Sequence, residues 1–237
     1  MKRKFAVFDI DGTIARNALF LQIVDQLIAN KNLDPKYREE LDKKYTNYLH
    51  RSHQDAFKEY TSLSVDVLFK NMKTLKTDEY RKAVDEVIKN SAKNVYVYTR
   101  QLILDLQKQG YFIIALSGSE MYAVQEFTKQ FNFDIAVGEN YHEKDGFLTG
   151  NVDNVFDRKD KFIKQFVEEH NLTYEDSYAV GDSLSDASML KMVENPIAFN
   201  PEDNLFEEAK RKGWKIVVER KNVIYELEPK NGTYLLA

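Results

Sequence analysis

The sequence predicts an α/β fold with a parallel sheet at its core and an α-helical segment inserted after the first strand. Three short, mostly apolar runs indicate buried strands at Phe5–Phe8, Tyr111–Leu116 and Ser177–Val180. Polar residues follow each run at once, and the carboxyl ends of parallel strands are where such sheets hold ligands. Residues 16–92, in contrast, have helical periodicity and contain no glycine. The chain therefore predicts a sheet core with a helical insert.

The first predicted strand ends in two aspartates. Its apolar run continues past Asp9 to Ile10, which is typical of a strand buried on both faces. Asp9 and Asp11 are two residues apart, so they project the same way from the strand end. Buried aspartate is costly unless it is paired or binds a metal. One of the two can act as a nucleophile and the other as a proton donor and acceptor. Gly12 allows a tight turn and leaves amides exposed towards an anion.

Residues 16–92 predict helices throughout. Apolar residues recur at helical spacing in four segments, without a convincing strand between them. Asp34, which precedes a proline, and Thr77 are typical of the N-caps that begin helices. We therefore expect a helical domain over 16–92 and a core domain formed by 1–15 and 93–237.

The helical segment is rich in tyrosine and holds His50 and His53. One interpretation is an aromatic substrate pocket with a histidine acid–base pair. The other is that the tyrosines pack between helices and that both histidines face solvent. The second is favoured, because two histidines three residues apart have no matching acid cluster nearby.

The second predicted strand ends at Ser117, Gly118 and Ser119, and a helix follows. A serine at such a junction presents a hydroxyl and backbone amides to an anion. Ser119 is predicted to be a plain N-cap of that helix. Ser117 lies at the strand end itself, at the same edge of the sheet as the two aspartates.

The helix predicted over residues 158–170 offers two lysines of different orientation. Lys159 shares a face with Phe162 and Phe166, whereas Lys161 lies on the opposite, polar face. Lysine seldom lies inward without a partner. Lys159 is therefore the candidate for the site, and Lys161 remains the alternative.

A third strand end brings two more acids. Gly181 and Asp182 directly follow the predicted strand at Ser177–Val180, and Asp186 comes shortly after them. Gly181 permits a sharp turn. The aspartates of the two strand ends would repel one another strongly unless a cation lay among them. Hard oxygen ligands with few nitrogen donors favour Mg²⁺.

The rest of the core predicts shorter elements. Residues 134–138 indicate a further strand, and Asp145 with the glycine after it indicates a hairpin. Residues 196–199 and 214–218 indicate two more strands, and the tail at 223–227 indicates an edge strand.

Composition excludes several classes of function. The chain has 237 residues, 43% hydrophobic and 30% charged, with a formal net charge of −4. This balance favours neither nucleic acid nor an anionic membrane as partner. The chain has no cysteine, which excludes disulfides, thiol catalysis and cysteine metal sites. The first apolar run is too short for a signal peptide, and no run has transmembrane length. We expect a cytoplasmic protein without stable membrane association.

Together the strand ends resemble the motifs of haloacid dehalogenase-like (HAD) phosphohydrolases. The segment DIDGT at residues 9–13 resembles their first motif, DxDGT, and GDSLSD at residues 181–186 resembles their fourth, GDxxxD. Ser117 and Lys159 lie where the second motif has Ser or Thr and the third has Lys. The helical segment lies where the first type of HAD cap belongs, and the carboxyl-terminal pattern is similar to that of subfamily IB, which includes phosphoserine phosphatases.

This resemblance implies a Rossmann-like core with an inserted helical cap, and an Mg²⁺-dependent phosphatase acting on a small phosphomonoester. Asp9 would attack phosphorus and form an aspartyl-phosphate. Asp11 would protonate the leaving oxygen and then activate the water that hydrolyses the intermediate.

The resemblance also implies the ligands. Mg²⁺ would be held by the Asp9 carboxylate, the Asp11 main-chain carbonyl and Asp182, while Asp186 would orient a ligand water or the lysine. Three groups would spread the charge of the phosphoryl group: Ser117, the Gly118 amide and Lys159.

Three positions depart from the phosphoserine phosphatase pattern. Ala18 lies where those enzymes normally carry a glutamate, Gly12 where they often have serine, and Ser119 where they have the second of two glycines. A small ester other than phosphoserine, such as a phosphorylated alcohol or lipid headgroup, is therefore at least as well supported. Two alternatives stay open, a non-catalytic phosphate-binding regulatory protein and a dehalogenase. Asp11, the second aspartate of the first motif, together with the acids of the fourth motif argues against a dehalogenase.

Overall fold

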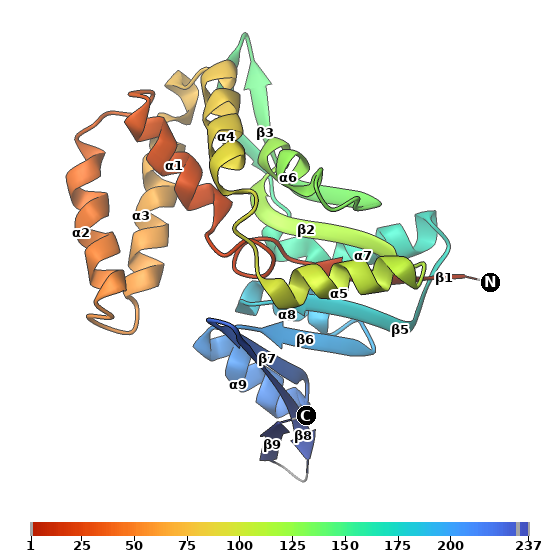
Figure 1. The fold of residues 1–237 in the computed structure, drawn as a ribbon. Helices are drawn as coiled ribbons and strands as arrows, with labels where there is room; N and C mark the ends of the chain where they lie inside the picture. The colour runs from red at the N-terminus through yellow and green to blue at the C-terminus, as the bar shows by residue number, and fades with distance from the viewer. Residues whose placement is uncertain (1, 231–232, 237) are drawn as a thin grey trace.

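The structure of the chain, a computed structural model, describes residues 2–230 and 233–236. Nine strands within these residues form one sheet in the order β4-β3-β2-β1-β5-β6-β7-β8-β9 (Figure 1). β1 (Arg3–Phe8) lies between β2 (Phe112–Glu120) and β5 (Leu172–Gly181) and is parallel to both. The other strands are β3 (Ile135–Lys144), β4 (Phe147–Asp153), β6 (Asn195–Phe199), β7 (Lys215–Arg220), β8 (Val223–Lys230) and β9 (Thr233–Leu236).

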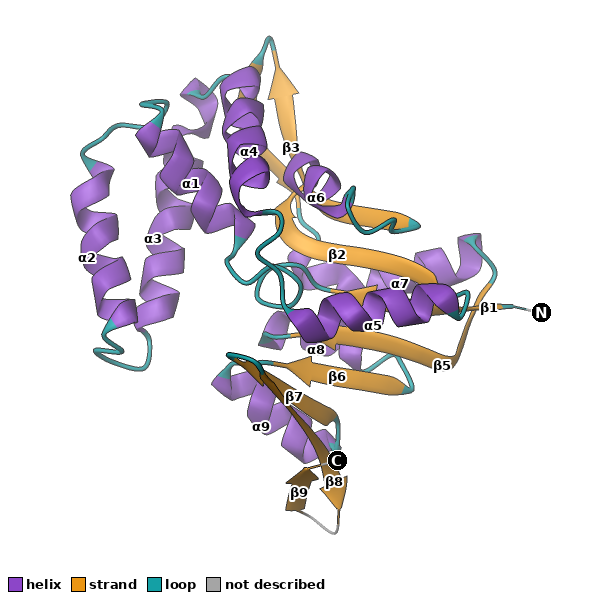
Figure 2. Ribbon diagram, in the orientation of Figure 1, coloured by secondary structure: helices purple, strands orange, loops and turns teal. Residues whose placement is uncertain are grey.

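Helices cover both faces of the parallel part of the sheet (Figure 2). They are α5 (Val97–Lys108), α6 (Met121–Thr128), α7 (Lys159–Glu169), α8 (Ala187–Leu190) and α9 (Asp203–Lys212). Ala6 and Phe8 of β1 pack in the core beneath α5 and α6, whereas Phe5 and Val7 pack in the core beneath α7, α8 and α9. Successive side chains of a strand alternate between its faces, so an unbroken apolar run is buried on both. The predicted α/β fold with a parallel sheet core is confirmed.

The chain between β1 and α5 is helical. It forms α1 (Leu19–Ala29), α2 (Tyr37–Leu49), α3 (Ala56–Asn71), a 3₁₀ turn at Met72–Thr74 and α4 (Thr77–Ser91). Residues 16–92 are all described and contain no strand. These helices lie beyond the carboxyl ends of the parallel strands, with α2 beside α3 (Figure 1). Among the described residues, no helix combines the length and apolar character needed to cross a membrane.

Two predicted helix starts are wrong in detail. α2 begins at Tyr37, and Asp34 accepts a hydrogen bond from the Lys36 amide at 3.0 Å in the turn before it. α4 begins at Thr77, whose buried hydroxyl has no hydrogen-bond partner and caps nothing. Most helical stability in a folded protein comes from tertiary packing, which can override a local capping signal.

The predicted hairpin at Asp145 is confirmed, whereas the prediction of an edge strand at 223–227 is wrong. The strand predicted at 134–138 continues into the hairpin as the single strand β3, and Asp145 (φ 53°) and Gly146 (φ 81°) form its turn. The tail at 223–227 forms β8, which is not an edge strand, because β9 pairs antiparallel along its outer side. β9 spans only four residues, too few to show a sequence pattern.

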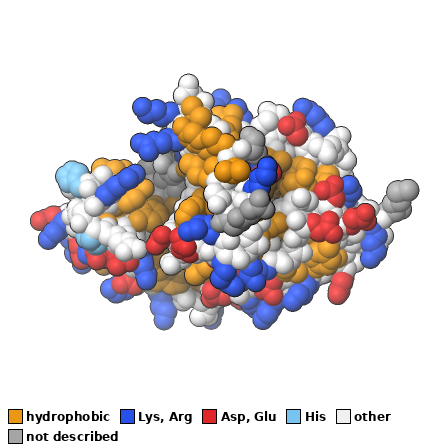
Figure 3. Space-filling model, turned by 90° about the horizontal axis from the view of Figure 1, so that it is seen from below, with side chains coloured by type: hydrophobic (Ala, Val, Ile, Leu, Met, Phe, Trp, Pro, Cys, Tyr) orange, Lys and Arg blue, Asp and Glu red, His pale blue; other side chains and the backbone are white. Residues whose placement is uncertain are grey.

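Charged side chains of both signs are interspersed over the face seen from below (Figure 3). His50 and His53 of the helical segment are both exposed, which agrees with the interpretation of solvent-facing histidines.

Candidate active site

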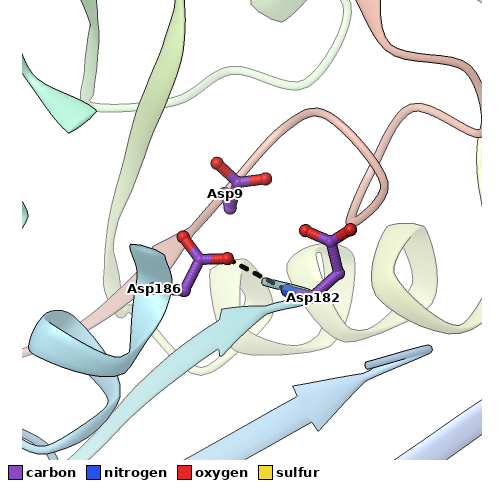
Figure 4. A group of neighbouring side chains, drawn as sticks. All are labelled: Asp9, Asp182 and Asp186. Carbon is purple, nitrogen blue, oxygen red and sulfur yellow. Dashed lines mark hydrogen bonds between the residues drawn. The ribbon is translucent and has the colours of Figure 1, made fainter. Parts of the chain in front are cut away.

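Aspartates from two neighbouring strands meet at the carboxyl edge of the sheet. Asp9 and Asp11 follow β1, and Asp182 follows β5. Asp186 ends a 3₁₀ turn at Leu184–Asp186. Carboxylate oxygens of Asp9, Asp182 and Asp186 lie within 4.8 Å of one another (Figure 4). β1 and β5 are paired in parallel, so their ends bring together residues more than 170 positions apart.

Lys159 neutralises part of this charge. Its Nζ donates to Oδ1 of Asp9 and to Oδ1 of Asp186, each at 2.6 Å, and the side chain is 1% exposed. Burial alone would lower the pKa of Lys159, but the carboxylates of Asp186 and Asp9 outweigh it and raise that pKa. Lys161 is exposed on the opposite face of α7. The geometry therefore favours Lys159 over Lys161.

Asp186 has both carboxylate oxygens engaged. Oδ1 accepts from Lys159, and Oδ2 accepts from the amides of Asp182 and Ser183 at 3.1 and 3.0 Å and from the Ser183 hydroxyl at 3.2 Å. The residue is fully buried. These contacts suit a residue that orients Lys159 and the loop of Asp182 better than one that binds a metal directly.

Asp11 lies in a separate set of hydrogen bonds. Its Oδ1 accepts from the Leu19 amide at 2.6 Å, and its Oδ2 accepts from the hydroxyls of Ser119 at 2.6 Å and Ser117 at 3.1 Å. Burial raises the pKa of Asp11, and these donors oppose that effect. The carboxylate is thus held in one orientation beside, and not within, the Asp9–Asp182–Asp186 group.

The prediction that Ser119 is a plain N-cap is wrong. Glu120 is the N-cap of α6, and its side chain accepts from the Tyr122 and Ala123 amides. β2 stays extended as far as Glu120, so Ser117 and Ser119 project to the same side, where both reach Asp11. The predicted strand ended at Leu116, and the further extension of β2 is what brings Ser119 to Asp11.

Replacing Ser119 by alanine should lower kcat about 10- to 100-fold with little change in KM, because Asp11 loses a charge-assisted hydrogen bond worth about 1.5–3 kcal/mol. Steady-state kinetics on a phosphomonoester measure this. Ser64→Ala is the matched control, because Ser64 is equally buried, at 1%, and bonds only the Tyr60 carbonyl in the helical segment. Equal losses in both variants would contradict the role of Ser119.

Two glycines leave room for the aspartates. Gly12 has φ +81°, and a Cβ there would lie 2.1 Å from Oδ2 of Asp182. A Cβ on Gly181 would lie 2.4 Å from Cβ of Asp186, although the backbone of Gly181 is not left-handed. Gly181 is therefore needed for space and not for the sharp turn that the sequence suggested. A side chain at position 12 would collide with Asp182 of the neighbouring strand end, and one at position 181 would collide with Asp186 in the loop after β5.

The donor set fits a hard divalent cation. Burial raises the pKa of Asp9 to about 7 despite Lys159, and burial with the charge of Asp9 raises the pKa of Asp182 well above its usual range. The carboxylates therefore need further positive charge to be ionised together. The oxygens of Asp9 and Asp182 are of the type that Mg²⁺ prefers, and Asp182 makes no ion pair in the described part of the chain.

The phosphate-binding candidates flank this group. Ser117 lies within the carboxyl-terminal part of β2, is fully buried, and its hydroxyl also accepts from the Ser119 amide at 2.9 Å. Gly118 follows it, with the Phe156 ring packed against its backbone. Ala18 is the N-cap of α1, next to the Leu19 amide that binds Asp11. Sequence reasoning had singled out neither Phe156 nor the Leu19 amide.

Proteins of similar sequence include phosphatases. A phosphoserine phosphatase of Methanocaldococcus jannaschii is 24% identical over 211 residues, which cover 88% of this chain and 90% of that protein. A histidinol-phosphatase of Neisseria meningitidis is 27% identical over 125 residues, covering 50% of this chain and 56% of the relative.

Solved structures share the fold. A Bordetella pertussis protein of unknown function has a TM-score of 0.70 at 20% identity, covering 91% of this chain and 98% of that one. A phosphoserine phosphatase solved as a phospho-aspartyl intermediate analogue has a TM-score of 0.63 at 23% identity, covering 93% and 95%.

The family follows from a match that spans most of the chain. Residues 6–191, which contain all four motif positions, match the model of the haloacid dehalogenase-like hydrolases. With its phosphatase relatives, this match supports the predicted class of hydrolase, one acting on phosphoric monoester bonds. The chain belongs to the haloacid dehalogenase-like hydrolases.

Proposed function

We propose that this protein is an Mg²⁺-dependent phosphatase that hydrolyses a small phosphomonoester through an aspartyl-phosphate. The observation that carries the proposal is the contact of Lys159 with both Asp9 and Asp186 beside Asp182. A buried carboxylate held by a lysine suits a nucleophile facing a phosphate dianion. The phospho-aspartyl intermediate analogue known for a phosphoserine phosphatase of this fold supports it.

Asp9 acts as the nucleophile, and Asp11 acts as the proton donor and acceptor. A carboxylate oxygen of Asp9 forms a bond to phosphorus as the bond from phosphorus to the leaving oxygen breaks in line with it. Asp11 gives its proton to the leaving oxygen. Asp11 then takes a proton from the water that attacks the aspartyl-phosphate, which releases phosphate and restores Asp9. The hydroxyls of Ser119 and Ser117 and the Leu19 amide hold the Asp11 carboxyl in place for both proton transfers.

The remaining residues of the site stabilise the negative charge of the phosphoryl group. Ser117, the Gly118 amide and Lys159 hold the phosphoryl oxygens, and Asp186 keeps Lys159 directed at them. The Asp9 carboxylate, the Asp11 main-chain carbonyl and Asp182 would hold Mg²⁺. That ion supplies positive charge against the carboxylates and the phosphate.

We further propose that residues 16–92 are a cap that covers a site built on 1–15 and 93–237. Helices α1–α4 lie beyond the carboxyl edge where the aspartates meet (Figure 1). Opening and closing of such a cap would admit substrate and exclude water. The named activities of the relatives concern small phosphomonoesters. Ala18 offers no carboxylate to an ammonium group, so strict specificity for phosphoserine is not expected.

Chelation of divalent metal should abolish turnover. We expect wild-type protein to hydrolyse at least one ester in a panel containing phosphoserine, histidinol phosphate, glycerol phosphate and phenyl phosphate. EDTA should lower the rate at least about 100-fold, and added Mg²⁺ should restore it. Phosphate release measures this. If EDTA left the rate of hydrolysis unchanged, the proposed role of the metal would be wrong. Tight binding of phosphate without hydrolysis of any ester would indicate a regulatory binding protein.

A further inference from the structure

An ion pair with a buried carboxylate lies outside the four motif positions. The side chain of Glu219, on β7, is 2% exposed and accepts a hydrogen bond from Nη2 of Arg16. Its second oxygen accepts from the Tyr98 amide at 2.9 Å, and the Glu219 amide donates to Oδ1 of Asn200 at 2.9 Å. A buried ion pair gives little net stability over an apolar pair of similar volume, so what it contributes is a fixed geometry.

Arg16 lies where the chain passes from the core into the helical segment. Its Nε donates to the Val95 carbonyl at 3.1 Å, and its guanidinium carbon lies 4.9 Å from the centre of the Tyr96 ring. The Arg16 amide donates to the Asn94 carbonyl at 3.0 Å, which pairs the outgoing chain with the returning one. Both the backbone and the side chain of Arg16 are therefore held in place.

The chain after Arg16 returns to the acid–base residue Asp11. Leu19, which begins α1, donates its amide to Oδ1 of Asp11 at 2.6 Å. Only two residues separate Arg16 from Leu19, and of these Asn17 is exposed and Ala18 has no polar side-chain atom. Arg16 is thus the polar anchor of the linker at residues 16–18, from which the chain reaches Asp11.

The Leu19 amide matters because it completes the support of the Asp11 carboxylate. The hydroxyls of Ser119 and Ser117 hold Oδ2 from β2, whereas the Leu19 amide holds Oδ1 from the helical segment. Loss of the donor on one side would let the carboxylate turn away from the leaving oxygen. A catalytic group displaced by about 1 Å can lose about 10²-fold in rate.

We propose that the ion pair of Arg16 and Glu219 positions Asp11 for proton transfer. The pair anchors the linker at residues 16–18 to β7, and the linker holds the Leu19 amide on the Asp11 carboxylate. This inference rests on the proposed function, in which Asp11 protonates the leaving oxygen. Arg16 and Glu219 touch no reacting atom in this proposal and act only through the linker.

The leaving group of the ester separates this role from a general loss of folded protein. An alkyl ester such as glycerol phosphate needs a proton on its leaving oxygen, whereas 4-nitrophenolate leaves without one. In Mg²⁺, Arg16→Gln should lower kcat/KM about tenfold for glycerol phosphate but no more than about twofold for 4-nitrophenyl phosphate. Unfolding of part of the sample would lower both values equally. Glu219→Gln keeps an acceptor for the Tyr98 amide and should give the same difference between the esters.

Hydrogen exchange of the Leu19 amide provides a readout without turnover. Followed by NMR, its exchange rate should rise at least about tenfold in Arg16→Gln. Arg38→Gln is the matched control, because the Arg38 side chain is 38% exposed against 35% for Arg16 and pairs with Asp25 inside the helical segment. The control variant should change neither the exchange rate of Leu19 nor the ratio of the two kcat/KM values.

The double variant tests whether the pair acts as a unit. Arg16→Gln combined with Glu219→Gln should lose no more activity on glycerol phosphate than either single variant. Equal losses for the two esters, or a Leu19 exchange rate like that of wild type in Arg16→Gln, would overturn the inference and leave the phosphatase proposal intact. Wild-type protein that hydrolyses no ester would overturn both.

Discussion

Replacing Asp9 by asparagine should abolish phosphomonoester hydrolysis, with kcat at least about 10⁴-fold below wild type. The amide is nearly isosteric with the carboxylate but cannot form the bond to phosphorus. Lys159 retains Asp186 as a partner at 2.6 Å, so the site keeps its shape. Phosphate release and acid-stable trapping of phosphoenzyme measure the effect, and the variant should show no covalent phosphate.

The stability of the same variant serves as its control. The buried site holds four aspartates and pairs two of them with Lys159, so removing one negative charge relieves repulsion. We expect the Tm of metal-free Asp9→Asn protein to equal or exceed that of wild type. Residual turnover above about 1% of wild type would show that Asp9 is not the nucleophile.

Replacing Lys159 by methionine should be the most destabilising single change in the site. Methionine fills a similar volume, but Asp9 and Asp186 lose their buried cation, and an uncompensated buried charge costs about 3–5 kcal/mol. That is a large share of the roughly 5–15 kcal/mol by which a domain of this kind is stable. We also expect kcat to fall about 10²- to 10³-fold, because the phosphoryl charge loses a positive partner.

Urea denaturation and steady-state kinetics check this prediction, and Lys161→Met is its control. Lys161 lies two residues away on the same helix but is exposed. Its replacement should change stability by less than about 0.5 kcal/mol and leave kcat unchanged. If the two variants behaved alike, the choice of Lys159 over Lys161 would be wrong.

The order of elements was largely predictable from the sequence. Unbroken apolar runs such as Phe5–Phe8 can only be buried on both faces, which requires helices on both sides of a parallel sheet. The glycine-free stretch at 16–92 has helical periodicity that no strand can share. Local start signals were less reliable, since neither Asp34 nor Thr77 caps its helix. Tertiary packing can override such local signals.

The site was predictable where its residues lie at strand ends. Asp9 and Asp182 could be expected to meet, because parallel strands bring their carboxyl ends to one edge of the sheet. Lys159 could be chosen over Lys161 because the helical period assigns them to opposite faces. The partner of Ser119 could not be found in this way, because it depended on how far β2 stays extended beyond Ser117.

The sequence by itself determined the fold class, the family resemblance and the identity of the acids, because periodicity and motif spacing are local properties of the chain. Tertiary structure alone decided which groups touch. In the folded chain Lys159 donates a hydrogen bond to Asp186, Ser119 donates one to Asp11, and the ring of Phe156 packs against Gly118. Such contacts join distant segments, and their geometry depends on strand register and packing, which no local pattern encodes.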